Sequence, residues 1–222
     1  MTIDLIGNGI VCIMSLLGFI YAAAHYFRPE TETYQKMIAG ALGCLFICRL
    51  YEIVQFFVAE KLPKIFQVGV LGGIGCFMFL FAAFISTMDE FVDDGSKTFR
   101  KYRWRAVFFT LIYDAAAVMI LMSPSAPSFK ISNAIEQIMI GGTAFYSFKQ
   151  LIIPKALSKR AAYFKPFYLV SLLFSLGHML EIVIWVYDPQ GIAVWIIPYA
   201  IIIITIPALA PAFNWGVKRW KM

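Results

Sequence analysis

The sequence predicts an all-α integral membrane protein with seven transmembrane helices. Hydrophobic residues make up 61% of the 222 positions and charged residues only 14%, and the mean hydropathy is +0.76, well outside the range of soluble domains. The apolar residues form continuous runs of the length that a helix needs to cross a bilayer. They do not alternate as in the short strands of a membrane β-barrel. Because these runs fill the chain, we expect residues 1–222 to form a single membrane domain.

Turn and charge signals divide the chain into seven apolar windows. The separators include RPETETYQK, EKLPK, SPSAPSFK and YDPQG, which are rich in the residues that end helices. The first window lacks a positive leading region and a cleavage site, so we expect a retained helix there and not a signal peptide. The predicted helices span about 4–27, 36–58, 65–88, 104–123, 131–153, 166–187 and 191–213.

The basic residues predict the direction of the helices. The loops after the first, third and fifth windows, with the C-terminus, carry most of the lysines and arginines, whereas the opposite loops contain only Lys61, Lys64 and Lys130. The positive-inside rule then places the N-terminus outside and the C-terminus in the cytoplasm, in a plasma membrane. The basic stretches KTFRKYRWR and PKALSKRAAYFK suit anionic lipid head groups at the cytoplasmic face. We therefore expect no nucleic-acid partner.

Two parts of the chain resemble each other at a nearly constant offset. Residues 7–21 match residues 132–146 at Asn8/Asn133 and four other positions, and at a similar offset EIV in the second window falls on EIV in the sixth. This pattern predicts two parallel repeat halves, 4–88 and 131–213, joined by a linking helix at 104–123. The three-plus-one-plus-three layout resembles the architecture of SWEET sugar carriers and PnuC vitamin carriers. The resemblance is topological and implies a carrier-like arrangement.

Ionisable residues lie deep within these apolar windows. At about 1.5 Å per residue, Glu52 and Glu181 lie about 24 and 22 Å from the cytoplasmic starts of their helices, in the outer part of the bilayer. An ionised group facing lipid costs about 2.5–3.5 kcal/mol on insertion scales, so we expect these side chains to face one another or a polar cavity that opens outward. Helix periodicity does not decide whether Arg49 pairs with Glu52 or with Glu181. The predicted ligand- or proton-binding residues are Arg49, Glu52, Asp114, Glu136, His178 and Glu181.

These residues leave three functions open. The first is a small membrane carrier or ligand-binding protein, with proton coupling as an option: Arg49 would receive an anionic group or hold a carboxylate ionised, and the acidic residues would bind a cationic group or a proton. The second is a sensor or accessory subunit whose polar positions face a partner membrane protein. The third and least favoured is a metal-dependent membrane enzyme using His178 and the carboxylates, for which no spacing is diagnostic.

The sequence gives no motif for a familiar cofactor. By resemblance to the rhodopsins, retinal would need a Schiff-base lysine in the seventh window, and the run from Ile192 to Phe213 contains none. The chain has two histidines, His25 at the cytoplasmic end of its window and His178 beyond the middle of its own. Haem ligated by both of them is therefore not expected, although a haem shared with a partner subunit stays open. The cofactor and any metal remain unassigned.

Overall fold

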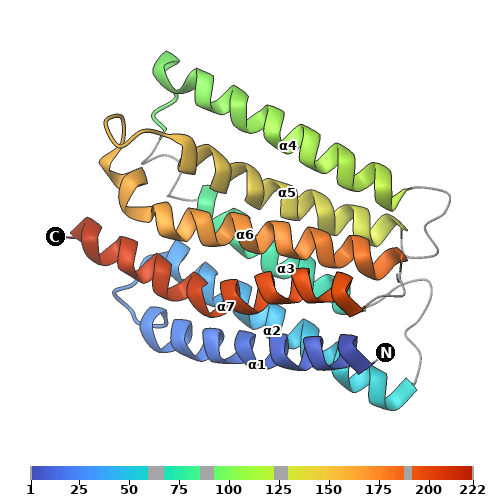
Figure 1. The fold of residues 1–222 in the computed structure, drawn as a ribbon. Helices are drawn as coiled ribbons and strands as arrows, with labels where there is room; N and C mark the ends of the chain where they lie inside the picture. Colours follow the sequence, from blue (N-terminus) through green and yellow to red (C-terminus); the bar gives the residue numbers. More distant parts are fainter. Residues whose placement is uncertain (1, 60–67, 86–92, 123–129, 188–191, 222) are drawn as a thin grey trace.

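The described chain is entirely helical. The computed structural model describes residues 2–59, 68–85, 93–122, 130–187 and 192–221, and these form seven α-helices and a short 3-10 helix with no strand among them (Figure 1). The α-helices are α1 (Thr2–Tyr26), α2 (Thr33–Ala59), α3 (Val68–Ala83), α4 (Arg100–Leu121), α5 (Lys130–Ile152), α6 (Lys159–Tyr187) and α7 (Ile192–Lys221), and the 3-10 helix η2 (Lys97–Phe99) precedes α4.

Five segments are long and apolar enough to cross a membrane. They are Leu5–Tyr26, Thr33–Val58, Lys97–Leu121, Ala161–Trp185 and Val194–Trp220. The described part of α3 is apolar but shorter, and α5 is not among the five because polar side chains interrupt it. The all-helical class is thus confirmed, and five of the predicted windows coincide with candidate spans.

Several helices extend beyond their predicted windows. α6 begins at Lys159, although 166 was predicted, and α7 continues to Lys221, although 213 was predicted. The predictions were short because lysine and arginine are good helix formers, so a helix continues past the apolar segment into its charged flank. The Ser158 hydroxyl caps the start of α6 by accepting the Ala161 N–H at 3.1 Å.

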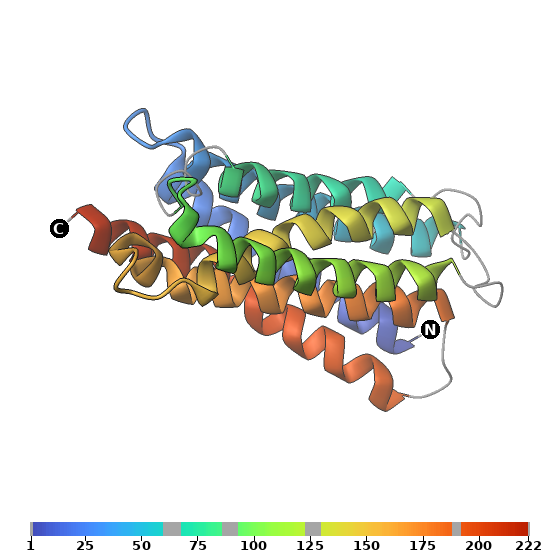
Figure 2. The ribbon, with the colours of Figure 1, turned by 90° about the horizontal axis from the view of Figure 1, so that it is seen from above.

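Six of the helices form a closed ring. Packing contacts link α1 to α2, α2 to α3, α3 to α5, α5 to α6, α6 to α7 and α7 back to α1. α4 lies outside this ring, packed mainly on α5 and to a small extent on α6 (Figures 1 and 2). A few contacts between α2 and α7 also cross the ring.

Aromatic side chains fill the interior. Phe77 stacks on Phe174 with ring centroids 5.3 Å apart, and Phe84 stacks on Phe167 at 5.6 Å. Tyr26 donates a hydrogen bond to the Ala210 carbonyl at 2.8 Å, which ties α1 to α7. Burial of such rings contributes much of the packing energy of a core.

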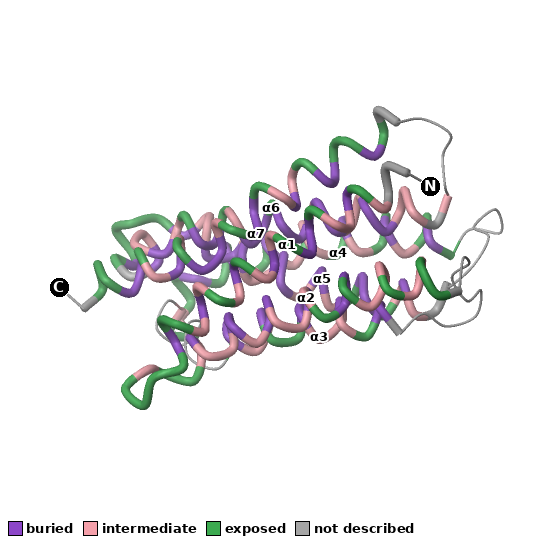
Figure 3. The backbone as a smooth tube through the Cα atoms, turned by 90° about the horizontal axis from the view of Figure 1, so that it is seen from below, coloured by how far each residue is buried: buried purple, intermediate pink, exposed green. Residues whose placement is uncertain are grey.

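The outward faces of the helices are also apolar. Along each helix, buried positions alternate with exposed ones (Figure 3), and large hydrophobic side chains occupy many of the exposed positions. They include Ile13, Leu17 and Ile20 on α1, Ile47, Val54 and Phe57 on α2, and Phe108, Leu111 and Ile112 on α4. A soluble protein rarely exposes so much contiguous apolar surface.

An ion cluster connects α4 and α5 at the end of the bundle where the chain ends. Asp93 accepts from Lys149 Nζ at 3.4 Å and lies 3.5 Å from Arg103 Nε. Next to it, the exposed Asp94 accepts a hydrogen bond from the Ser96 backbone N–H at 2.9 Å. Hydrogen bonding to the backbone and side chain of Ser96 lowers the pKa of the Asp94 carboxyl group. The cluster holds the segment before η2 against the two helices.

Candidate functional site

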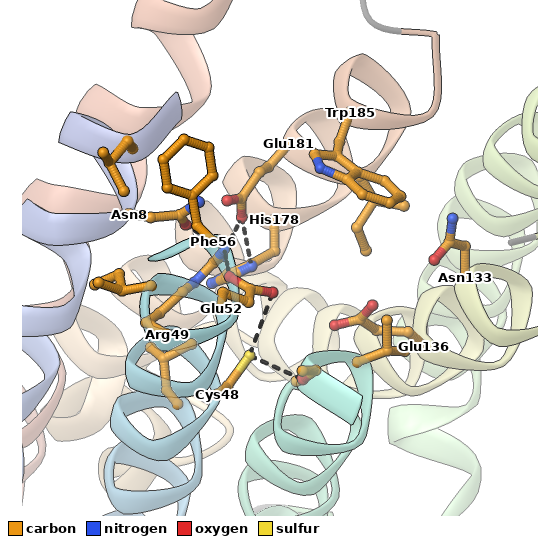
Figure 4. Close-up of a pocket in the computed structure, with 17 residues that line it drawn as sticks. Asn8, Cys48, Arg49, Glu52, Phe56, Asn133, Glu136, His178, Glu181 and Trp185 are labelled. Carbon is orange, nitrogen blue, oxygen red and sulfur yellow. Dashed lines mark hydrogen bonds and ion pairs between the residues drawn. The ribbon is translucent and has the colours of Figure 1, made fainter. Parts of the chain in front are cut away.

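A pocket opens at the end of the bundle where the chain begins. About 820 Å³ of space without protein atoms lies along it, a volume that includes open solvent at its mouth. Helices α1, α2, α3, α5 and α6 supply its walls. Figure 4 shows the side chains that line it, with Arg49, Glu52 and Glu181 on one side and Glu136 on the other.

Arg49 joins three helices within the pocket. Its Nη1 donates to Asn8 Oδ1 at 2.8 Å and to Glu52 Oε2 at 3.0 Å, while its Nη2 donates to Glu181 Oε2 at 2.5 Å. Only 8% of the Arg49 side chain and 7% of the Glu181 side chain are exposed. The pairing that the sequence left open therefore includes both glutamates, and the guanidinium group is largely engaged by carboxylates.

His178 lies beside this network and packs against two phenylalanine rings. Its Nδ1 is 3.1 Å from Glu181 Oε2, and its ring lies edge-on to Phe77 and Phe174, with centroids 5.3 and 4.6 Å away. In the neutral tautomer with the proton on Nδ1, His178 donates to Glu181. Its Nε2 is buried without a hydrogen-bond partner. The histidine therefore orients Glu181 as the carboxylate binds Arg49.

Glu136 is the carboxylate that the network leaves out. Glu136 is only 8% exposed, and its carboxyl group forms no hydrogen bond or ion pair with any described residue. Its carboxyl group points into the pocket (Figure 4). Oε1 lies so close to Gly73 that a Cβ on this glycine would be 1.9 Å away. A buried carboxylate without a partner is energetically costly, so this position calls for a counter-charge or a proton.

Glycines of α3 make room for two of these carboxylates. A Cβ on Gly69 would lie 2.8 Å from Glu52 Oε1, and the Gly69 carbonyl also accepts from the Cys48 thiol at 2.9 Å. Gly69 and Gly73 are four residues apart and share a face of the helix. The glycine-rich stretch of α3 therefore admits the two carboxylates as well as the neighbouring helix.

Asp114 lies apart from the other predicted site residues. It is half-buried on α4, outside the pocket lining, and Gln137 Nε2 approaches its Oδ1 at 3.5 Å. A Cβ on Gly141 would lie 2.1 Å from both of its oxygens. The structure thus brings together five of the six predicted residues, Arg49, Glu52, Glu136, His178 and Glu181, and places Asp114 at the contact between α4 and α5.

Much of the remaining lining is apolar and was not predicted as part of the site. It includes Leu5, Ile53, Phe56, Ile182 and Trp185, and the amide of Asn133 adds a polar group. Phe56 and Trp185 follow Glu52 and Glu181 by four residues each, and this helical spacing was a signal that the sequence offered. Within the described part of the chain, no three histidine, cysteine or acidic side chains are arranged to hold a metal ion.

The two histidines differ in their surroundings. His25 is exposed at the far end of α1, where its Nδ1 lies 2.8 Å from the Tyr21 carbonyl oxygen, whereas His178 is buried in the pocket.

No family model, curated protein or solved structure matches this chain.

Proposed function

We propose that this chain is a seven-helix plasma-membrane protein that takes up or senses a small molecule from outside through the pocket. The five candidate spans and their apolar outer faces support insertion in a bilayer. α3 and α5 complete the ring between longer helices, so they cross with them. α5 turns its polar side chains inward: Gln137, Thr143 and Ser147 are fully buried, and Ile135 and Ile138 are exposed.

The arrangement of the polar residues supports two related halves. Asn8 corresponds to Asn133, Arg49 to His178 and Glu52 to Glu181 in the sequence repeat, and all six line the same pocket. A binding site at the interface of repeats is the usual arrangement in carriers, and this favours a carrier.

The charge distribution supports an outward-facing pocket. Most of the basic residues lie at the end of the bundle opposite the pocket, including Arg28, Lys155 and Lys218. The positive-inside rule makes that end cytoplasmic. The N-terminus and the pocket mouth are then outside, and the basic flanks contact anionic lipid head groups.

The observation that carries the proposal is the pocket itself, with its buried charges directed inward. An accessory subunit that binds partner helices through polar contacts would present such groups on its outer surface. Here the outer surface of α1 and α2 is apolar instead, with Ile13 59% and Ile47 64% exposed. A small-molecule site is therefore favoured over a helix-docking function.

A ligand screen on the purified protein tests this function. Ile53 lines the pocket, whereas its neighbour Val54 is 51% exposed on the outer face. We expect a library of small metabolites to contain compounds that raise the thermal midpoint of the native protein. Ile53→Trp fills the pocket and abolishes these shifts, and the matched Val54→Trp variant keeps them. Shifts that persist in Ile53→Trp, or a library without any hit, would reject the pocket as the binding site.

A further inference from the structure

The pocket contains more acidic than basic side chains. Arg49 faces three carboxylates, those of Glu52, Glu136 and Glu181. Its two terminal nitrogens bind Glu52 and Glu181, and its Nε is buried without a hydrogen-bond partner. An anionic ligand would have to displace a carboxylate from the guanidinium group. The charge balance therefore disfavours anions, including the anionic group considered for Arg49 from the sequence.

Glu136 is the acidic side chain that lies apart from the Arg49 network. It lies across the pocket from the Arg49 network (Figure 4), is more than nine-tenths buried and has no hydrogen bond or ion pair with any described residue. The repeat gives it no counterpart, because the matching position in the first half is Val11. An acidic side chain added to one half only, and aimed into the shared pocket, fits a ligand with a single positive charge.

The other walls determine what kind of cation fits. Phe56 and Trp185 offer aromatic faces, and Leu5, Ile53 and Ile182 add aliphatic surface. Aromatic faces attract organic ammonium groups, and no three histidine, cysteine or acidic side chains of the described residues are arranged to hold a bare metal ion. We infer that the pocket binds a small organic cation, an ammonium group on an apolar body, with Glu136 as its counter-charge. This inference rests on the proposed binding function and specifies its ligand class.

Three probes of similar shape and different charge test the ligand class. Benzylammonium, benzyl alcohol and benzoate are titrated into the purified full chain at pH 7.5, with binding followed by calorimetry. We expect benzylammonium to bind most tightly and benzoate not at all. Glu136→Gln should weaken benzylammonium binding by about 10- to 100-fold, the range of a charge-assisted contact. Asp114→Asn, which removes a carboxylate outside the pocket, should leave binding unchanged.

A second variant covers the case in which Glu136→Gln does not fold. Gly73→Ala places a methyl group where the Glu136 carboxyl group now lies, so it should displace that group and weaken benzylammonium binding without removing any charge. Unchanged binding in Glu136→Gln or Gly73→Ala would overturn the inference, as would tighter binding of benzoate.

The outcomes separate this inference from the proposed function. If benzyl alcohol, benzoate or a neutral library compound binds and Ile53→Trp abolishes that binding, the pocket binds ligands but the cationic class is wrong. If benzylammonium fails to bind, the inference is overturned and a proton is the partner left for Glu136. If no compound binds in a manner sensitive to Ile53→Trp, the proposed function fails as well.

Discussion

At the scale of single residues, Arg49 connects the charges of the pocket. It contacts Glu52 on its own helix, Asn8 on α1 and Glu181 on α6. All of these groups are largely buried, so their energies depend on one another. Removing one member of a buried ion network leaves the others uncompensated, and this costs more than the network contributes as a whole.

Arg49→Met should therefore destabilise the protein strongly. We expect a loss of about 3–5 kcal/mol in the free energy of unfolding, because two carboxylates remain buried without their cation. Denaturant titration in detergent measures it, with the exposed Arg105→Met as control. The triple variant Arg49→Met, Glu52→Gln, Glu181→Gln should recover part of the loss, because it removes the orphaned charges too. A single-variant loss below about 1 kcal/mol would mean that water screens the network.

The sequence indicated these residues but not their relations. Helical spacing placed Arg49 with Glu52, and His178 with Glu181, on shared faces. The contact between Arg49 and Glu181 depends on how α2 and α6 pack, which periodicity does not encode. The sequence also could not predict that Glu136 has no ion pair with Arg49. This depends on Arg49 being bound to Glu52 and Glu181, which again follows from helix packing.

At the scale of elements, the glycines of α3 determine how closely this helix approaches α2. A Cβ on Gly72 would lie 2.5 Å from Cys48 Cβ and 3.0 Å from the Cys44 carbonyl oxygen. One of these atoms belongs to the backbone, so it cannot move without shifting the helix. By contrast, a Cβ on Gly9 of α1 would meet nothing within 4 Å.

Gly72→Ala and Gly9→Ala should consequently have opposite effects. We expect Gly72→Ala to lower the free energy of unfolding by about 1–3 kcal/mol through overpacking. Gly9→Ala should raise it by about 0.5–1 kcal/mol, because alanine restricts the unfolded chain and favours the helix. Thermal and denaturant unfolding of the two variants measure the difference. Equal stability of both would show that α3 does not pack against α2 at Gly72.

The element boundaries show what the sequence could predict. The apolar windows overlap each of the seven described α-helices, since hydropathy reflects the residues that avoid water. The predicted ends were less accurate: α6 and α7 extend into the charged flanks 159–165 and 218–221, where hydropathy falls but helix propensity stays high.

The sequence did not predict that Gly69 and Gly73 leave space for carboxyl groups, because small residues in apolar helices usually indicate close packing alone.

At the scale of the whole molecule, six helices form a ring and α4 lies outside it, and the two repeat halves stay a prediction. The repeat was inferred from a few matching positions, among them Asn8/Asn133 and Glu52/Glu181. These residues line one pocket. In a carrier, the two halves would move relative to each other around this site, and the aromatic layer of Phe77 and Phe174 below it would close the path to the cytoplasm.

The central claim is that the pocket opens to the outside and prefers cations. Cysteine labelling in intact cells tests both parts at once, in a variant whose four native cysteines are replaced. Ile53→Cys should react with membrane-impermeant thiosulfonates, and faster with the trimethylammonium reagent than with the sulfonate reagent, because Glu136 and its neighbours attract positive charge. Val54→Cys, on the outer apolar face, should stay unlabelled. Labelling of Ile53→Cys only after the cells are permeabilised, or faster labelling by the sulfonate reagent, would contradict the account.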